Sequence, residues 1–258
     1  MKRFGGSGVL AALLSFNGGF VDAAGFFGLQ GLFVAHVTGN FVTLGAALVH
    51  GSHGIIGKVL ALPEFILAVA LARLLGSALR KRQLPALRIL LATKVALLIC
   101  FFALAVGYGP FPDPNTPAAL LAGFSGIAAM AVQNAVQRVH FASLPPTTMM
   151  TGTTVQATLD AVDLLTGAEP AQAAVVRTRF RRFALTLICF AAGCAAAAVL
   201  YAYVGFWCLA VAVIVGATAA TMALSLPAHQ ADRLPGAARQ LQAEVGRLLG
   251  SLALSISI

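Results

Sequence analysis

Long apolar runs separated by short polar or basic segments fill most of this 258-residue chain. An α-helix of about 20 apolar residues is long enough to cross the hydrocarbon core of a bilayer. Charged residues make up 10% of the chain, whereas a typical soluble domain has about 25%. The sequence therefore predicts an all-α polytopic membrane protein. Six runs have the length of a transmembrane helix, namely 9–35, 55–79, 88–108, 118–138, 183–203 and 205–226, and two shorter pieces are 36–50 and 148–166.

The two shorter pieces share a pattern. Thr38-Gly39 lies in the first and Thr151-Gly152 in the second, and a polar residue stands sixteen or seventeen positions before each pair inside an apolar run. That residue is Asp22 in the first half and Asn134 in the second. Duplication inside an apolar chain is typical of transporters built from structural repeats. We therefore interpret the chain as two related halves rather than as a coincidence of a common dipeptide.

Basic residues predict the orientation of these segments. If each short piece is re-entrant and returns to its own side, there are six full spans, and most of the 17 Lys and Arg residues fall on the cytoplasmic side. Lys58 is then near the outside, and Arg73 and Lys94 are close enough to the cytoplasmic clusters to extend toward them. If the short pieces were full spans, eight in all, the basic group at Arg80–Arg88 would lie on the other side of the membrane from the N-terminus. The basic residues therefore favour six spans, but the sequence does not decide whether the short pieces are re-entrant or full spans.

Three spans in each half would insert the halves with opposite orientation, which is an inverted 3+3 repeat. We expect residues 1–108 to form the first repeat and 118–226 the second, inverted one. Residues 227–258 have leucines at helical spacing between arginines and predict an amphipathic cytoplasmic tail. Both termini are then cytoplasmic, and we expect no cleavable signal peptide.

Four motifs resemble a known family. They are Gly19–Ala23, Phe33–Asn40, Gln133–Ala135 and Met150–Thr153. Their order and spacing are similar to those of the YoaK family of bacterial membrane proteins, also called domain of unknown function 1275, over residues 10–225. The resemblance implies a small multi-pass protein of the bacterial inner (cytoplasmic) membrane. It implies no established activity, so the functional expectation rests on the motifs themselves.

The Thr-Gly turns are the expected solute site. Thr38 can cap the helix that begins at Gly39, as Thr151 or Thr153 can in the second half, and Gly permits a sharp turn and close approach of a ligand. Two helix N-termini that meet at the membrane centre would attract an anion or a carbonyl-rich solute. The alternative is that Thr-Gly only allows helices to pack tightly. The candidate solute-binding residues are Asp22, His36, Thr38, Gly39, Asn40, Gln133, Asn134, Thr151, Gly152 and Thr153.

Asp22 is the main candidate for proton coupling, because a carboxyl group in the middle of a span is costly and is usually functional. The alternative is a structural hydrogen bond or a salt bridge, for instance to Lys94 or Arg73. Glu64, which follows Pro63, is a second proton-coupling candidate, or it lies among the outer headgroups. Asp160 and Asp163 are expected to face solvent or to pair with the basic stretch Arg177–Arg182.

The sequence favours a secondary transporter of a small polar or anionic solute, proton-coupled through Asp22. A passive channel of the same architecture, or a membrane scaffold or enzyme that transports nothing, are the alternatives. An enzyme is not expected because no catalytic motif is present. No cofactor is expected, nor a metal, since His50 and His53 have no accompanying carboxylate or Cys. The expected partners are the solute and the lipid bilayer, without nucleic acid, and assembly into a homo-oligomer stays open.

Overall fold

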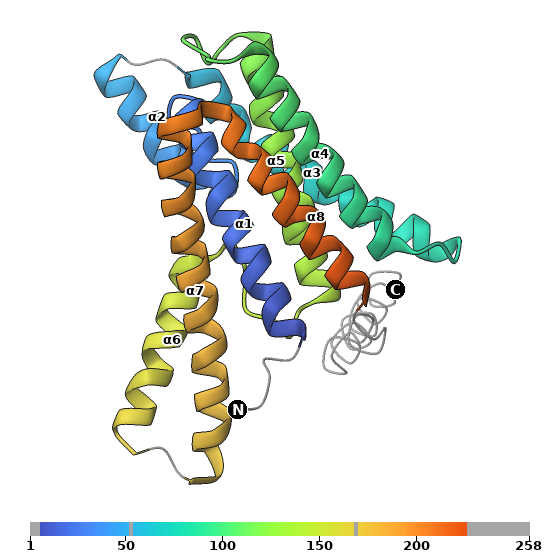
Figure 1. Cartoon of the computed structure of the whole chain (residues 1–258), viewed down its shortest axis with the longest axis vertical. Coiled ribbons are helices and arrows are strands. Elements are labelled where there is room, and N and C mark those ends of the chain that lie inside the picture. Colours follow the sequence, from blue (N-terminus) through green and yellow to red (C-terminus); the bar gives the residue numbers. More distant parts are fainter. Residues whose placement is uncertain (1–5, 52–53, 168–169, 226–258) are drawn as a thin grey trace, which may run out of the picture.

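The computed structural model describes residues 6–51, 54–167 and 170–225. Within these ranges every regular element is a helix, which confirms the all-α prediction (Figure 1). The predicted tail 227–258 lies outside the described residues. The elements are α1 Gly6–Gly28, α2 Gly39–His50, α3 Ile55–Lys81, α4 Ala86–Tyr108, α5 Pro117–His140, α6 Met150–Leu165, α7 Pro170–Val204, the 3-10 helix η1 Gly205–Cys208 and α8 Leu209–Ser225.

Five helical segments of the described chain are long and apolar enough to cross a membrane. Four are α1, α3, α4 and α5, and the fifth, Gln172–Ser225, contains α7, η1 and α8. The chain reverses direction at η1 (Figure 1), where Gly205 has φ +55°, a left-handed conformation that favours glycine. The protein is therefore of the multi-pass membrane type.

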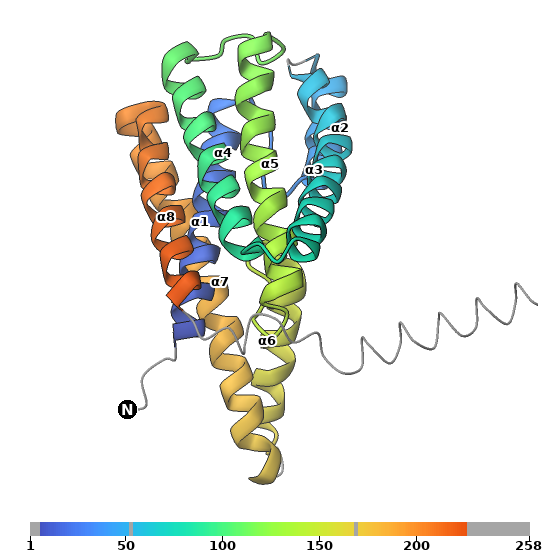
Figure 2. The ribbon, with the colours of Figure 1, turned by 90° about the vertical axis from the view of Figure 1, so that its right-hand side faces the viewer.

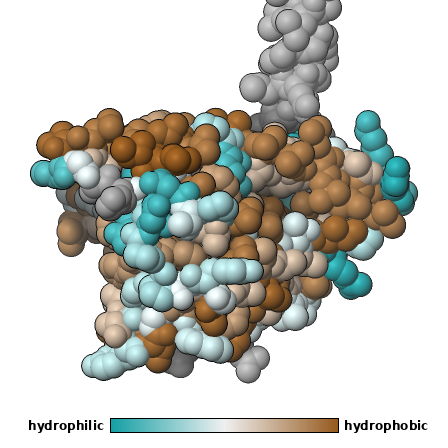
Figure 3. All heavy atoms as spheres, turned by 90° about the horizontal axis from the view of Figure 1, so that it is seen from above, coloured by the Kyte–Doolittle hydropathy of each residue, from teal (hydrophilic) through white to brown (hydrophobic). Residues whose placement is uncertain are grey.

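The helices α1 and α5 form the centre of the molecule. In each of these two helices, 67% of the most apolar 18-residue stretch is buried. The corresponding share is 22% in α3, 33% in α4 and 17% in Gln172–Ser225. The helix α1 packs against α7 and α8, and α5 packs against α3 and α4 (Figure 2). Seen from one end in Figure 3, apolar side chains make up much of the outline. The outer helices therefore present an apolar surface suited to lipid, and the inner pair carries Asp22 and Asn134.

The first predicted span is shorter than expected. The helix α1 ends at Gly28 rather than at residue 35, and residues 29–38 form a non-helical segment with Leu29, Val34 and Val37 buried. An apolar run cannot by itself distinguish a helix from a buried irregular segment. Backbone of this kind is tolerated at membrane depth where protein covers it, and here α1 and α2 supply its hydrogen bonds.

The two short helices extend toward opposite ends of the molecule. The helix α2 lies with the start of α3 at the upper end in Figure 1, and α6 reaches the lower end beside the start of α7. The predicted helix 183–203 is instead 35 residues long and begins at Pro170, so the basic stretch Arg177–Arg182 belongs to the helix. A helix of this length extends about 50 Å, which exceeds a hydrocarbon core of about 30 Å. Its basic first half, with α6, therefore projects beyond the rest of the bundle.

Candidate functional site

Asp22 fastens the first non-helical segment to α1. Its Oδ1 accepts hydrogen bonds from the backbone N–H groups of Ala35 at 2.6 Å and His36 at 3.2 Å. Its Oδ2 lies 2.7 Å from Nδ1 of His36. Only 4% of Asp22 is exposed. The carboxyl group is thus enclosed by three nitrogen partners of the segment that it holds in place.

His36 is the partner of Asp22, rather than the Lys94 or Arg73 that the sequence suggested. Its ring packs edge-on against Phe190, with centroids 5.2 Å apart, and 34% of its side chain is exposed. Lys94 does not extend toward a cytoplasmic cluster, because it is 1% exposed and its amine has no hydrogen-bond partner among the described residues.

Neutral groups fasten the second non-helical segment, residues 141–149, to α5. Thr148 Oγ1 donates to Asn134 Oδ1 at 2.7 Å, and Gln133 Nε2 donates to Thr147 Oγ1 at 3.1 Å. Gln137 Nε2 donates to the carbonyl oxygen of Leu144, at 3.3 Å. The Asn134–Thr148 bond spans 14 residues, as does the Asp22–His36 pair. The two segments are therefore tied to their helices at the same sequence spacing but by different chemistry.

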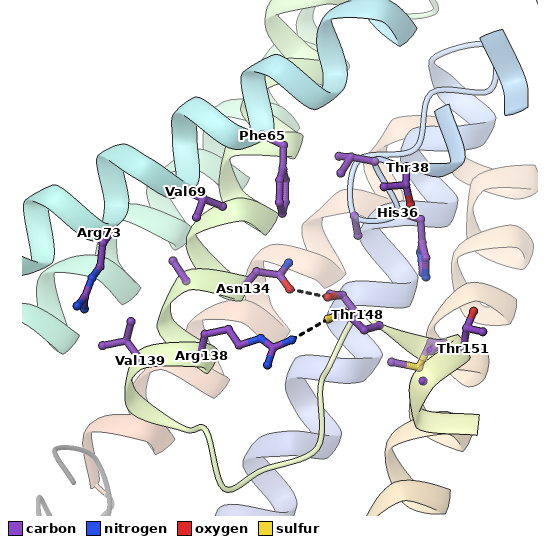
Figure 4. Close-up of a pocket in the computed structure, with 16 residues that line it drawn as sticks. His36, Thr38, Phe65, Val69, Arg73, Asn134, Arg138, Val139, Thr148 and Thr151 are labelled. Carbon is purple, nitrogen blue, oxygen red and sulfur yellow. Dashed lines mark hydrogen bonds between the residues drawn. The ribbon is translucent and has the colours of Figure 1, made fainter. Parts of the chain in front are cut away.

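A pocket of about 580 Å³ brings both Thr-Gly turns together (Figure 4). We call it the arginine chamber, because the side chains of Arg73 from α3 and Arg138 from α5 line it. Arg138 Nη2 also lies 3.3 Å from Met149 Sδ. None of the described residues that line this chamber is acidic. Its lining residues are Ala35, His36, Val37, Thr38, Phe65, Val69, Arg73, Asn134, Ala135, Arg138, Val139, Thr148, Met149, Met150, Thr151 and Gly152.

A second pocket, of about 530 Å³, lies between α1 and α7. We call it the aromatic chamber, since phenylalanine rings form much of its wall. His36 and Thr38 line both chambers. The residues of the aromatic chamber are Asp22, Ala23, Phe26, Phe27, Phe33, His36, Thr38, Gly39, Phe190 and Cys194.

The Thr-Gly turns do not cap their helices as predicted. Thr38 is at the N-cap position of α2 but its side chain makes no capping hydrogen bond. Thr151 lies inside α6, whose N-cap is Met149, and Thr153 Oγ1 donates back to the Met149 carbonyl oxygen at 3.0 Å. Gly39 and Gly152 are not among the residues with positive φ, so neither turn requires glycine for its backbone conformation.

The helix starts differ in what they offer an anion. The amides of Gly39, Asn40 and Phe41 already bond to the carbonyl oxygens of residues 36–38. Met150 and Gly152 instead lie at the first helical positions of α6, where N–H groups have no acceptor within the helix, and both line the arginine chamber. The start of α6 is therefore the better anion-binding element.

The remaining candidate residues line neither chamber. Asn40 is buried, and its amide bonds to both the N–H and the carbonyl oxygen of Phe33, at 2.8 Å each. Gln133 and Thr153 are also buried and serve the scaffold. Glu64 lines neither chamber, and its Oε2 is enclosed without a hydrogen-bond partner among the described residues.

Arg73, Arg138 and Thr148 are lining residues that were not predicted from the sequence. Arg138 follows Asn134 by one helical turn, so the i, i+4 spacing could have placed both on one face of α5. Arg73 had no such signal, because its position depends on how α3 packs against α5. Thr148 could have been found from the 14-residue spacing that Asp22 and His36 share.

The projecting hairpin contains an ion pair that the sequence anticipated. Arg179 Nε donates to both carboxylate oxygens of Asp160, at 3.0 and 2.9 Å, and its Nη2 donates to Oδ1 at 2.6 Å. These hydrogen bonds from the guanidinium hold the pKa of Asp160 below its usual value. Among the described residues, no group of three His, Cys, Asp or Glu side chains is placed to hold a metal ion.

The chain matches one family of known proteins. A model of the family described as "Protein of unknown function (DUF1275)" matches residues 10–222. No curated protein and no solved structure matched the chain.

Proposed function

We propose a function on the premise that this chain belongs to the DUF1275 family: it is a secondary transporter of a small anionic solute, coupled to protons through Asp22 and His36. The observation that carries the proposal is the arginine chamber. Two arginines, the first turn of α6 and both Thr-Gly turns surround one space without an acidic lining residue among those described.

Charge and hydrogen bonding favour an anion in this chamber. A hydrogen bond to a charged group contributes about 1.5–3 kcal/mol, and Arg presents several donors in a planar fork. The chamber's volume of about 580 Å³ is within the range of small-molecule sites, roughly 300–1,000 Å³. Most of its other lining side chains are apolar, so the two arginines, one on α3 and one on α5, supply its positive charge.

An inverted repeat supports transport rather than static binding. The helices α1 and α5 run in opposite directions (Figure 1), and each is followed by a non-helical segment and a short helix. The packing partners also correspond: α1 with α7 and α8, α5 with α3 and α4. Counting α7 and α8 separately would give six spans in two halves of opposite orientation. We place both termini in the cytoplasm by the positive-inside rule, in the bacterial inner membrane that the family resemblance implies.

His36 links the proton to the solute. With Asp22 as the carboxylate, Nδ1 of His36 carries the proton of their 2.7 Å contact, and Nε2 is left to bind or release a second proton. A protonated ring would add positive charge to the wall of the arginine chamber, and loss of that proton would remove it. Solute affinity and proton binding would therefore be linked reciprocally.

Binding and uptake of permanently ionised sulfonates test the proposal, because any pH dependence then comes from the protein. We expect purified protein in nanodiscs to bind benzenesulfonate, and Arg138→Gln to weaken its Kd by a factor of 10 or more, on the order expected for losing one charged hydrogen bond. The matched control is Arg82→Gln, which removes an exposed arginine outside both chambers.

Uptake into proteoliposomes separates a coupled transporter from a passive channel. A transporter should accumulate benzenesulfonate when a pH gradient is imposed at zero membrane voltage, whereas a channel should only equilibrate it. Absence of anion binding to the wild-type protein would contradict both versions of the proposal.

Cysteine accessibility tests the orientation. Cysteines that replace His53 and Asn115 should react with an impermeant thiol reagent from outside the cell, and those that replace Gln83 and Gln230 should not. External labelling at position 83 would contradict the six-span topology.

A further inference from the structure

The aromatic chamber corresponds to the arginine chamber residue by residue. On α1, Asp22 and Phe26 line the aromatic chamber, and on α5 their counterparts Asn134 and Arg138 line the arginine chamber. In each pair the residues are four positions apart, one turn of a helix. His36 and Thr148, the hydrogen-bond partners of Asp22 and Asn134, also line these chambers.

The residues on the opposite wall of each chamber, from α7 and α3, also correspond. Phe190 and Cys194 of α7 complete the aromatic chamber, and Phe65 and Val69 of α3 complete the arginine chamber. Both pairs have four-residue spacing, and both place a phenylalanine first. Because α7 packs on α1 as α3 packs on α5, the two chambers are the same structural feature formed twice, each with walls from both halves.

The chambers meet at His36 and Thr38, which line both. We infer that the aromatic chamber is a second binding chamber for the transported solute, that His36 and Thr38 are the partition between the chambers, and that the solute is an organic anion with an apolar body. This inference rests on the proposed function and adds the path and the class of substrate.

The chemistry of the walls sets the substrate class. An inorganic anion would lose its hydration in the aromatic chamber, where the described lining residues include four phenylalanines and Asp22 but no arginine. An apolar body instead gains from burial against these rings, by about 25 cal/mol per Å². Arg73 and Arg138 hold the charged group in one chamber, and the apolar part is accepted by both.

Cys194 is a native reporter of this chamber. It is half-buried, and its Sγ contacts the Gly19 carbonyl oxygen at 3.4 Å. Cys100 is exposed on α4 and lines neither chamber, so it is the internal control. Wild-type protein is treated with methyl methanethiosulfonate at fixed pH, and chymotryptic peptides are analysed by mass spectrometry, since cleavage after Phe190 separates Cys194 from Cys189.

We expect saturating benzenesulfonate to slow the modification of Cys194 about fivefold or more and to leave that of Cys100 unchanged. Methanesulfonate has the same charged group without the ring, so it should bind more weakly and protect Cys194 little. Equal binding of methanesulfonate or inorganic sulfate overturns the substrate class. Binding and uptake of benzenesulfonate without protection of Cys194 overturn the second chamber but not the proposed function, whereas absence of any anion binding overturns the proposed function itself.

A matched pair of variants tests the path independently of labelling. Ala23 and Ala135 are counterparts on the walls of the aromatic and arginine chambers. Ala135→Phe should abolish both binding and uptake of benzenesulfonate. Ala23→Phe should abolish uptake while binding in the arginine chamber changes less than about threefold, a difference of about 0.7 kcal/mol. Normal uptake by Ala23→Phe overturns a path through the aromatic chamber, and if this variant does not fold, the Cys194 measurement decides.

Discussion

The two non-helical segments are held by corresponding bonds of different chemistry. Residues 29–38 are held by the Asp22 carboxyl group, which accepts from two backbone amides and contacts an imidazole, and by the Asn40 side chain, which bonds to the backbone of Phe33. Residues 141–149 depend on three neutral side chains of α5, namely Gln133, Asn134 and Gln137. The first connection changes when a proton is gained or lost, and the second does not.

The two arginines of the chamber come from different halves, Arg73 from the half with Asp22 and Arg138 from the other. Arg138 lies in the half with the neutral connection, and its counterpart in the half with Asp22 is Phe26. We interpret the two segments as similar frameworks with different tasks. In our account groups from both halves hold the anion, and the Asp22–His36 pair responds to the proton.

Replacing each connecting side chain by leucine should give the largest contrast. Asp22→Leu leaves the amides of Ala35 and His36 and the imidazole without their partner in a buried setting. We expect it to destabilise the protein by about 3–5 kcal/mol, because each buried donor left without a partner costs about 1–3 kcal/mol. Asn134→Leu leaves the Thr148 hydroxyl without its acceptor and should cost about 1–2 kcal/mol. Thermal unfolding of the purified proteins measures both, and equal losses would contradict the distinction.

Asp22→Asn should have a smaller effect on stability and a specific effect on His36. The Asn oxygen can still accept from the two amides, but its NH₂ group must donate to Nδ1, which moves the imidazole proton to Nε2. We expect a loss of about 1–2 kcal/mol, because a charged hydrogen bond becomes neutral, and loss of pH-dependent uptake.

Nitrogen-15 NMR of histidine-labelled protein reports this tautomer change directly. The ring proton of His36 should be on Nδ1 in the wild type and on Nε2 in Asp22→Asn. Asn134→Asp is the control, since it places a carboxyl group at the corresponding position without a histidine partner. Unchanged pH dependence in Asp22→Asn would show that the carboxyl group is structural.

The all-α, multi-pass membrane type could be predicted from the sequence, because apolar runs of the length of a span reflect the bilayer directly. The broken elements, Asp22 and Asn134 were found from the duplicated motif. The end of α1 at Gly28 was not predicted, since residues 32–35 continue the apolar run beyond Gln30 and Gly31, whose positive φ angles end the helix. Arg73 was missed because its place in the site comes from packing between α3 and α5, which no local pattern encodes.

Substitution by alanine should change the stability of the protein differently at the two glycines of the Thr-Gly pairs. A Cβ on Gly39 would lie 3.0 Å from a ring carbon of Phe33, which would have to shift, whereas a Cβ on Gly152 meets nothing within 4 Å. Gly152→Ala should therefore maintain or raise stability by up to about 1 kcal/mol, through helix propensity. It should nevertheless weaken benzenesulfonate binding, because the added methyl group obstructs the approach to the first turn of α6.

Thermal unfolding and titration of Gly39→Ala and Gly152→Ala measure this contrast. Gly39→Ala should slightly lower stability and leave binding nearly unchanged. Full affinity in Gly152→Ala would show that the anion does not approach the start of α6.

The smallest expected effect concerns the ion pair Asp160–Arg179, which secures α6 to α7. Because Arg179 lowers the pKa of Asp160 in the folded protein, the pair stabilises the fold above the ordinary Asp pKa of about 3.9. This stabilisation is lost as the pH falls through the folded pKa. Asp160→Asn should therefore lower the unfolding temperature at pH 7, and the difference from wild type should shrink toward pH 3. A difference independent of pH would assign the effect to packing.

The central claim is that both Thr-Gly turns surround one anion site, and locating a bound anion tests it most directly. A crystal structure with 4-bromobenzenesulfonate would place the bromine by its anomalous signal. We predict the sulfonate beside Arg73, Arg138 and the start of α6, with the bromine directed toward His36. Bromine found only at the basic surface of Arg177–Arg182, with protein side chains filling the space between the two turns, would contradict the account.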